Sequence, residues 1–366
     1  MATNVDDEEY DRVKEVKKFD ESKIGVKGLV DSGITTIPRF FVHPPDVLSQ
    51  LKPGSKIRPD LVIPTIDLSG VDSHHNRSLI VDQIRQACSS FGFFQIINHG
   101  VPLGVLDRMI ESIKGFHEEP TEIKARFYTR GVGLGSIGVS YVSNVDLYNS
   151  KAASWKDTLR IKLGSKMADH DQIPEICRNE VIEWDREIKR LGEVLSGLMC
   201  EGLGVETWRL KEMTCLEDTT MLGHYYPKCP QPDLTVGLAY HTDPDVFTVL
   251  LQDNVGGLQV KYGEYWVDVK PVPGALIINV GDLLQIISNE VYKSGEHRVL
   301  ANSSHEPRVS IAVFFNAGNK DDLYGPLPEL ISSEKPALYR QFTMTDFRTR
   351  FSKREVDGFL SNYYKL

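Results

Sequence analysis

The sequence predicts a mixed α/β protein with a mainly β core, arranged as a double-stranded β-helix (jelly roll) that helices in the N-terminal half support. Two observations predict this fold class. Up to residue 217 apolar residues recur mainly at helical spacing, whereas from residue 218 short runs rich in β-branched and aromatic residues alternate with turn signals. Regularly spaced short strands are typical of a sandwich or a barrel.

The N-terminal half is expected to form two segments. Residues 1–62 mix charged helix-like stretches with proline-bearing connections, and we interpret them as an N-terminal helical extension. Residues 63–217 are interpreted as a mixed α/β region that opens with a strand and a turn at 63–70. A helical pattern then ends at Gly92, directly before an apolar strand at 93–97.

Two longer helices are expected in the same region, over residues 102–128 and 181–203, because large apolar residues recur there every three or four positions. Gly204 is expected to end the second helix. The jelly-roll core is expected at 218–320, and a C-terminal helical tail at 321–366. The predicted core strands are residues 221–226, 247–252, 258–262, 265–269, 275–280 and 309–315.

Composition favours a globular protein with a small-molecule partner. The 366 residues are 41% hydrophobic, which is enough to bury a large core. With 51 acidic residues against 42 Lys and Arg the formal charge is −9, so electrostatics favour neither nucleic acid nor an anionic membrane. The N-terminus is charged and no run of about 18 apolar residues occurs, so neither secretion nor a membrane span is expected.

Three side chains form a candidate metal site. His241 and Asp243 stand at positions i and i+2 near a strand end, where side chains project to the same side. His297 precedes another predicted strand, and a jelly roll can fold it back over the first pair. Two imidazoles and one carboxylate form the facial ligand set that suits octahedral iron(II) and leaves three positions open. An isolated H-x-D motif more often lies on the surface or in a turn without binding a metal, so the interpretation as a metal site depends on accompanying features.

Arg308 and Ser310 are the accompanying feature. They also stand at i and i+2, on the predicted strand RVSIAVFF, so a guanidinium and a hydroxyl point the same way. A buried arginine needs an anionic partner, and its planar fork matches a carboxylate. A dicarboxylate such as 2-oxoglutarate meets that need. The alternative is an ion pair between Arg308 and an aspartate across the sheet.

Several motifs together resemble the plant 2-oxoglutarate and iron(II)-dependent dioxygenase family, and the resemblance covers essentially the whole chain. They are GFFQIINHG (92–100), YYPKCPQPDL (225–234), HTD (241–243), GGLQV (256–260), PGALIINVGDLLQIISN (273–289), EHRV (296–299) and RVS (308–310). The opening stretch at 19–45 resembles more narrowly the branch of 1-aminocyclopropane-1-carboxylate oxidase homologues. These motifs are specific for the family and carry no information on the substrate.

The resemblance implies a set of co-substrates and their ligands. Iron(II) would be held by the two histidines and the aspartate, and the distal carboxylate of 2-oxoglutarate by Arg308, Ser310 and Tyr226. Dioxygen would take the last coordination position, with ascorbate as a reductant. The implied reaction is the oxidation, foremost the hydroxylation, of a small plant specialised metabolite through an iron(IV)-oxo intermediate, with release of succinate and CO2.

Three other functions stay open at this point. A zinc hydrolase could use the same three ligands, but zinc offers no account of Arg308 and Ser310. A non-catalytic protein on this scaffold would bind metal and 2-oxoglutarate without consuming either. An ascorbate-dependent oxidase is disfavoured, because authentic 1-aminocyclopropane-1-carboxylate oxidases carry a lysine where this chain has Leu222.

The expected substrate pocket is drawn from three predicted strands. Its candidate residues are Leu222, His224, Phe314, Asn316, Thr158 and Arg160. Arg160 could bind an acidic substrate if its strand borders the pocket, but a solvated charged face shared by Thr158, Arg160 and Lys162 is the preferred interpretation. Core packing is an equal alternative for Phe314.

Two positions depart from the family pattern. His224 stands where many relatives carry Asn, and it could bind the co-substrate or fill the pocket wall. Gly295 stands where relatives usually carry Val, next to a metal ligand, and its effect on metal binding is open.

Other motifs are interpreted as structural. Gly133, Gly135 and Gly138 form a G-x-G-x-x-G pattern, but no helix is expected after it, so a loop over the substrate mouth is preferred to a dinucleotide site. His99 and His117 have no second ligand at short spacing. The five cysteines are scattered and lack a C-x-x-C pair, so they are expected to be reduced thiols of a cytoplasmic protein. We expect the chain to be a monomer.

Overall fold

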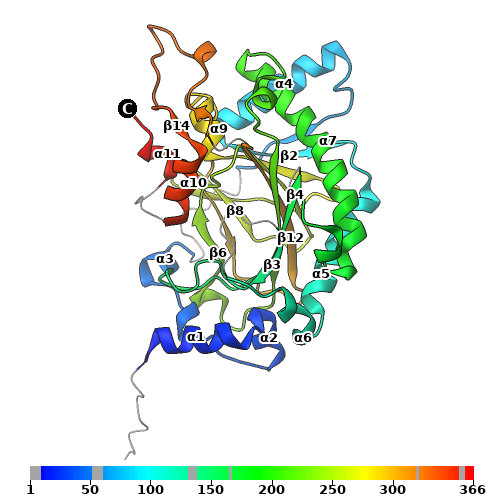
Figure 1. The fold of residues 1–366 in the computed structure, drawn as a ribbon, viewed down its shortest axis with the longest axis vertical. Helices are drawn as coiled ribbons and strands as arrows, with labels where there is room; N and C mark the ends of the chain where they lie inside the picture. The colour runs from blue at the N-terminus through cyan, green and yellow to red at the C-terminus, as the bar shows by residue number, and fades with distance from the viewer. Residues whose placement is uncertain (1–9, 52–60, 131–137, 165–166, 319–320, 354–358) are drawn as a thin grey trace, which may run out of the picture.

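The protein is described here from a computed structural model, which describes residues 10–51, 61–130, 138–164, 167–318, 321–353 and 359–366. Two sheets face each other as a jelly roll, and helices surround them (Figure 1). None of the helices in these ranges is both long enough and apolar enough to cross a membrane.

The larger sheet has eight strands in the order β1-β2-β10-β7-β12-β5-β4-β3. Their bounds are β1 Thr65–Asp67, β2 Phe93–Ile97, β3 Val139–Val142, β4 Asp157–Gly164, β5 Asp218–Tyr226, β7 Phe247–Gln252, β10 Leu276–Val280 and β12 Arg308–Asn316. Strands that precede residue 218 therefore extend the jelly-roll sheet at both edges. The division of the chain into domains at that residue stays a prediction, because one sheet runs across it.

The smaller sheet has four strands in the order β6-β11-β8-β9. They are β6 Val236–His241, β11 His297–Leu300, β8 Leu258–Tyr262 and β9 Tyr265–Asp268. All six predicted core strands therefore form within one or two residues of the expected bounds, except that the first begins three residues earlier. The jelly roll predicted from the strand spacing is confirmed.

Three amphipathic helices, α4 (His74–Ser90), α5 (Leu103–Glu118) and α7 (Arg178–Leu203), cover the outer face of the larger sheet (Figure 1). α7 ends where predicted, at Gly204 with φ 76°. The helix expected over 102–128 is shorter than predicted. Pro120 has no backbone N–H to donate and restricts the preceding residue, so α5 ends at Glu118.

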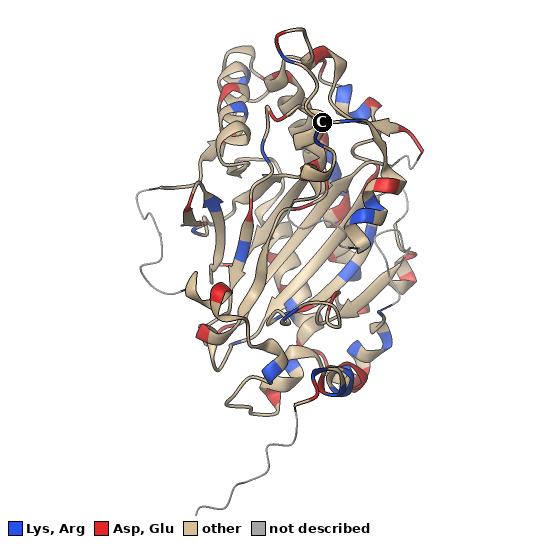
Figure 2. Ribbon diagram, turned by 90° about the vertical axis from the view of Figure 1, so that its left-hand side faces the viewer, with Lys and Arg blue, Asp and Glu red and all other residues tan. Residues whose placement is uncertain are grey.

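Short helices connect these elements. They are α6 Thr121–Lys124, α8 Arg209–Glu212 and α9 Asp282–Ile287, with 3-10 turns at η2 Ala125–Phe127, η3 His170–Gln172, η4 Glu175–Cys177, η5 Pro232–Leu234 and η6 Pro328–Leu330. The side view shows that most charged residues lie on helices and loops, while isolated Lys and Arg interrupt the strands (Figure 2).

The N-terminal extension is helical, as predicted, and closes one end of the sheets (Figure 1). It consists of α1 Arg12–Ser22, α2 Gly25–Asp31, η1 Arg39–Phe41 and α3 Pro45–Ser49. The buried carboxylate of Asp157, at the start of β4, accepts hydrogen bonds from the backbone amides of Val26 and Lys27, each at 2.8 Å. These amides lie in the first turn of α2, where a carboxylate is favoured. A side chain at Gly25 would collide with that carboxylate.

The sequence predicts a helical C-terminal tail, but the tail also contains two short strands. α10 (Met344–Lys353) and α11 (Leu360–Tyr363) are accompanied by a two-stranded sheet of β13 (Leu323–Tyr324) and β14 (Phe342–Thr343). Strands of two residues have too short a pattern to be recognised from periodicity. Arg348 of α10 donates to the carboxylate of Asp218 on β5 at 2.8 Å, which ties the tail to the larger sheet.

Candidate active site

His241 and His297 are brought together by strand pairing. His241 is the last residue of β6 and His297 the first of β11, and the two are direct partners in the antiparallel register. Their ring centroids are 4.2 Å apart. Opposite residues of an antiparallel pair lie close and on one face, so the pairing places both imidazoles side by side.

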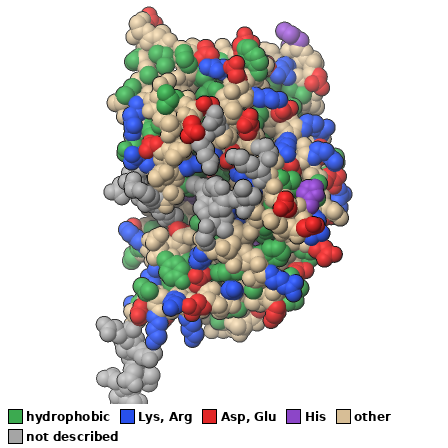
Figure 3. Space-filling view, viewed as in Figure 1, with side chains coloured by type: hydrophobic (Ala, Val, Ile, Leu, Met, Phe, Trp, Pro, Cys, Tyr) green, Lys and Arg blue, Asp and Glu red, His purple; other side chains and the backbone are tan. Residues whose placement is uncertain are grey.

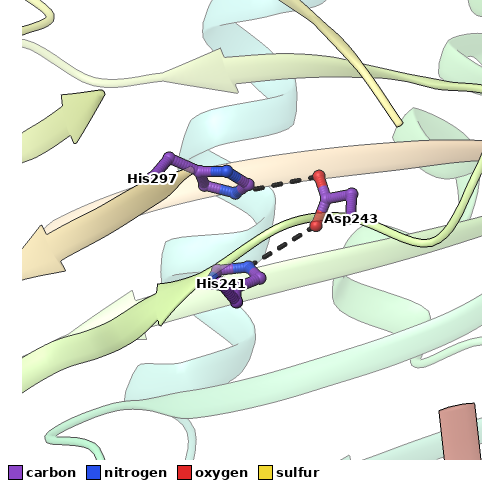
Figure 4. Close-up of side chains that lie close together, drawn as sticks. All are labelled: His241, Asp243 and His297. Atoms are coloured by element: carbon purple, nitrogen blue, oxygen red, sulfur yellow. Dashed lines mark ion pairs between the residues drawn. The ribbon is translucent and has the colours of Figure 1, made fainter. Parts of the chain in front are cut away.

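Asp243 completes the cluster from the segment that follows β6. Its carboxylate oxygens lie 3.5 Å from Nε2 of His241 and 3.8 Å from Nε2 of His297. One ligand atom from each of the three side chains lies within 4.8 Å of the others, and all three point toward one another (Figure 4). The i, i+2 spacing predicted that His241 and Asp243 would lie together. The pairing of β6 with β11 adds His297.

Both imidazoles are held with Nε2 toward the cluster. Nδ1 of His241 is 2.9 Å from the carbonyl oxygen of Ala239, and Nδ1 of His297 is 3.1 Å from that of Gly295. A carbonyl only accepts, so each Nδ1 carries the proton and each Nε2 presents its lone pair to the centre of the cluster. This is the arrangement in which histidines ligate metals.

The carboxylate of Asp243 is ionised and oriented by two buried polar neighbours. Its Oδ2 accepts hydrogen bonds from Thr248 Oγ1 and Asn279 Nδ2, each at 2.9 Å. Burial alone would raise the pKa of Asp243, but His297 and His241 beside it bring that pKa below its ordinary value. Burial lowers the pKa of His297 to about 4, so it is a neutral ligand near pH 7.

These residues fit iron(II). Two imidazole nitrogens and one carboxylate oxygen form a borderline and hard donor set without thiolate, which would suit one face of an octahedral iron(II). Within the described residues it is the one group of His, Cys, Asp or Glu side chains close enough to hold a metal ion.

Arg308 is buried on the inner face of the larger sheet, with 2% of its surface exposed. Nη1 donates to Ser310 Oγ at 2.9 Å and Nη2 to Gln252 Oε1 at 3.0 Å, while Nε has no partner. The guanidinium lies 4.9 Å from the ring of Tyr226, its direct neighbour on β5.

Among the described residues, Arg308 forms no ion pair with an aspartate across the sheet. The nearest candidate, Asp253, accepts a hydrogen bond from the backbone amide of Val309, and it interacts with the charge of Arg308 only from beyond ion-pair distance. Both partners of the guanidinium are neutral, so the buried positive charge still needs an anion. Gln252 was missed by the sequence interpretation, because only the register of β7 against β12 brings it to Ser310.

The expected pocket residues share this inner face. His224 is paired with Ser310 on one side and Thr158 on the other, and Leu222 with Ala312 and Arg160. The remaining candidates, Phe314 and Asn316, lie farther along β12 and are partly exposed. Phe314 belongs to none of the buried hydrophobic clusters, so the core-packing alternative is wrong for it.

The charged face of β4 is not solvated, which corrects the preferred sequence interpretation. Thr158, Arg160 and Lys162 are 3%, 8% and 2% exposed. Lys162 forms a buried ion pair with Asp218. The side chains of β4 alternate between its two faces as predicted. The sequence of one strand does not show, however, which of its faces is buried by another layer of the protein.

His224 is a neutral hydrogen-bonding residue. Its Nδ1 lies 3.0 Å from Thr158 Oγ1 and 3.3 Å from Lys156 Nζ. An ammonium only donates, so Nδ1 accepts and Nε2 carries the proton. Burial, with Lys156 and Arg308 adding to it, holds the pKa of His224 well below its ordinary value. Lys156 was not among the predicted site residues.

The space around residue 295 is too small for any side chain, so this position requires glycine. A Cβ at Gly295 would lie 2.6 Å from Cδ2 of Phe93 and 2.8 Å from the carbonyl oxygen of Phe91. The Phe93 ring in turn packs edge-on against His297, with centroids 5.1 Å apart. This chain therefore uses the missing side chain to bring an aromatic ring against a metal ligand.

Gly295→Ala should therefore destabilise the fold by about 1 to 3 kcal/mol, since the methyl group overpacks the contact with Phe93. It should also weaken metal binding by displacing His297. Urea unfolding and calorimetric titration with Mn²⁺ measure the two effects. Gly197→Ala is the control, because its Cβ would meet no atom closer than 3.9 Å. Unchanged stability and metal affinity would contradict this account of Gly295.

His99 and His117 are structural, as expected. The Nε2 of His99 is 2.9 Å from the carbonyl oxygen of Gly274, and that of His117 is 3.0 Å from that of Gly223. Burial lowers the pKa of His117 to about 3. The five cysteines are free and buried. The predicted loop over the substrate mouth, residues 131–138, lies outside the described residues except for Gly138.

Two family models match the chain. The model of the 2OG-Fe(II) oxygenase superfamily matches residues 217–317, and that of the N-terminal region of non-haem dioxygenases in morphine synthesis matches residues 63–181. The chain belongs to the 2OG-Fe(II) oxygenase superfamily and is an Fe(II)/2-oxoglutarate-dependent dioxygenase. Within it, a similar protein is 1-aminocyclopropane-1-carboxylate oxidase homolog 4 of Arabidopsis thaliana, 47% identical over 98% of this chain and 100% of the relative.

Solved structures of the superfamily have the same fold. JOX2, in complex with 2OG, Fe and JA, matches with a TM-score of 0.80 and 31% identity over 93% of this chain and 97% of its own. The dioxygenase for auxin oxidation (DAO) of rice matches with a TM-score of 0.70 and 27% identity, over 83% of this chain and 100% of its own.

Proposed function

We propose that this chain oxidises a small organic metabolite, foremost by hydroxylation, at iron(II) held by His241, Asp243 and His297. 2-Oxoglutarate is the co-substrate, and its distal carboxylate binds Arg308 and Ser310. The observation that carries the proposal is a buried guanidinium whose hydrogen-bond partners are all neutral, on the inner face of the larger sheet, while the smaller sheet carries His241 and His297 at the ends of β6 and β11. When bound, the iron supplies the activation of dioxygen that C–H oxidation needs.

The protein residues bind and orient in this proposal. Ser310 and Gln252 fix the plane of the Arg308 guanidinium, so that its unpaired Nε–H is set before the co-substrate arrives. Thr248 and Asn279 hold Asp243 by one oxygen and leave the other for the metal. His224 offers Nε2–H as a donor on the same face.

Succinate release with a panel of plant metabolites tests the function. Protein loaded with Fe(II) is incubated with 2-oxoglutarate and oxygen, and succinate is measured with and without each compound. We expect at least one compound to stimulate succinate formation and to gain one oxygen atom in equal amount. Binding of 2-oxoglutarate without succinate from any compound would instead indicate a non-catalytic binder. Oxidation that needs ascorbate but not 2-oxoglutarate would indicate the ascorbate-dependent alternative.

A further inference from the structure

Lys156 is forced toward the interior by the N-terminal extension. It directly precedes β4, and both of its neighbours are held from the other side. The indole of Trp155 packs edge-on against Phe41 of η1, with centroids 4.9 Å apart, and the carboxylate of Asp157 binds the first turn of α2. Within β4 the side chains of Asp157 and Thr158 point to opposite faces. Lys156 Nζ contacts Thr158 Oγ1, so Lys156 points inward, and only 9% of its surface is exposed.

Among the described residues, the ammonium of Lys156 forms hydrogen bonds only with neutral side chains and forms no ion pair, while the carboxylates of Asp146 and Asp157 attract it from beyond ion-pair distance. Its Nζ lies 3.3 Å from Thr158 Oγ1 and 3.3 Å from His224 Nδ1. Lys162, farther along the same face, is paired with the carboxylate of Asp218. Burial lowers the pKa of Lys156 to about 8, so it is still mostly protonated near pH 7. A buried ammonium that is not paired directly with a carboxylate is costly, so an anion is expected to bind it.

The proposed co-substrates do not supply that anion. The charges of iron(II) and of Arg308 are balanced by Asp243 and by the two carboxylates of 2-oxoglutarate. β5 lies between β4 and β12, and burial, together with the charges of Lys156 and Arg308, holds the pKa of His224 on β5 well below its ordinary value. Lys156 is thus left without an ion-pair partner on the other side of His224.

We propose that the substrate is an organic acid whose carboxylate binds Lys156, on the β4 side of the inner face. This inference rests on the proposed function. Leu222 and Phe314 lie on the same face, and neither is fully buried, so they suit an apolar body attached to the acid group. On the face shown in Figure 3 the acidic and basic side chains are interspersed, and Lys156 itself is buried.

Matched pairs of carboxylic acids and their methyl esters test this inference. Phenylacetic, cinnamic and indole-3-acetic acids with their esters are titrated into protein loaded with Mn²⁺ and 2-oxoglutarate, and the melting temperature gives the affinity. The same compounds are then compared for succinate release with Fe(II). We expect acids to bind at least 10-fold more tightly than their esters, because an ester keeps the body and loses the charge. Esters that bind as well as the acids would overturn the proposal.

The variant Lys156→Met removes the charge and keeps the length of the side chain. It should weaken acid binding about 10- to 100-fold and leave ester binding unchanged, and Lys156→Arg should restore part of the loss. Lys17→Met is the control, since Lys17 is 65% exposed. If Lys156→Met weakens 2-oxoglutarate instead, while the preference for acids persists, the lysine serves the co-substrate and the proposal is wrong. If wild-type protein with Mn²⁺ gains no stability from 2-oxoglutarate, the proposed function itself fails.

Discussion

His241→Ala is expected to lower iron-dependent turnover by about a thousandfold or more, while the melting temperature of the metal-free protein changes little. The Lewis-acid contribution of a metal centre amounts to several kcal/mol, and each 1.36 kcal/mol is about a tenfold change in rate. His241 is the ligand that can be removed with least structural damage. Its side chain is 34% exposed, whereas those of Asp243 and His297 are 6% and 10% exposed.

Succinate release, calorimetric Mn²⁺ binding and circular dichroism are the measurements for this variant. His75→Ala is the matched control, because His75 is exposed and distant from the cluster in sequence and fold. The expected pattern is loss of metal binding and turnover with a native spectrum. A folded His241→Ala protein that still binds Mn²⁺ with wild-type affinity would show that the metal lies elsewhere.

Arg308→Lys is expected to raise the KM for 2-oxoglutarate about 10- to 100-fold, with a smaller effect on kcat. A charge-assisted hydrogen bond contributes about 1.5 to 3 kcal/mol, and an ammonium cannot reproduce the planar fork. The fork matters here because Ser310 and Gln252 hold its two Nη atoms, so Arg308 presents a preset plane. Lysine keeps the charge but loses both of these contacts.

Steady-state kinetics with varied 2-oxoglutarate, together with a direct binding titration, check this prediction. Arg186→Lys, at a position 70% exposed, is the control. The two predictions are independent, because one removes a metal ligand and the other changes only the proposed carboxylate site. An unchanged KM in Arg308→Lys, with normal metal binding, would place the co-substrate carboxylate on another group.

The N-terminal extension contacts the residues on both sides of Lys156. If the substrate carboxylate binds Lys156 as proposed, this segment, which resembles one branch of the family, supports the wall of the substrate site. Differences in substrate among relatives can arise in this way without any change at the metal.

The strands, the two ligand pairs and the fold class could be predicted because they depend on local backbone geometry. Side chains alternate with period two along a strand, and this places Arg308 beside Ser310; the same spacing predicted the pair of His241 and Asp243, although β6 ends at His241. The stop at Gly204 is equally local. The family resemblance added Tyr226 and the identity of the co-substrate.

The tertiary structure alone decided which residues from distant segments meet. Gln252, Lys156 and Asn279 have no distinguishing pattern in the sequence, and strand register and packing bring them to the site. The burial of Arg160 was misjudged for a related reason. A strand's own residues fix how its side chains alternate, but which of its faces is buried depends on layers contributed by other parts of the chain.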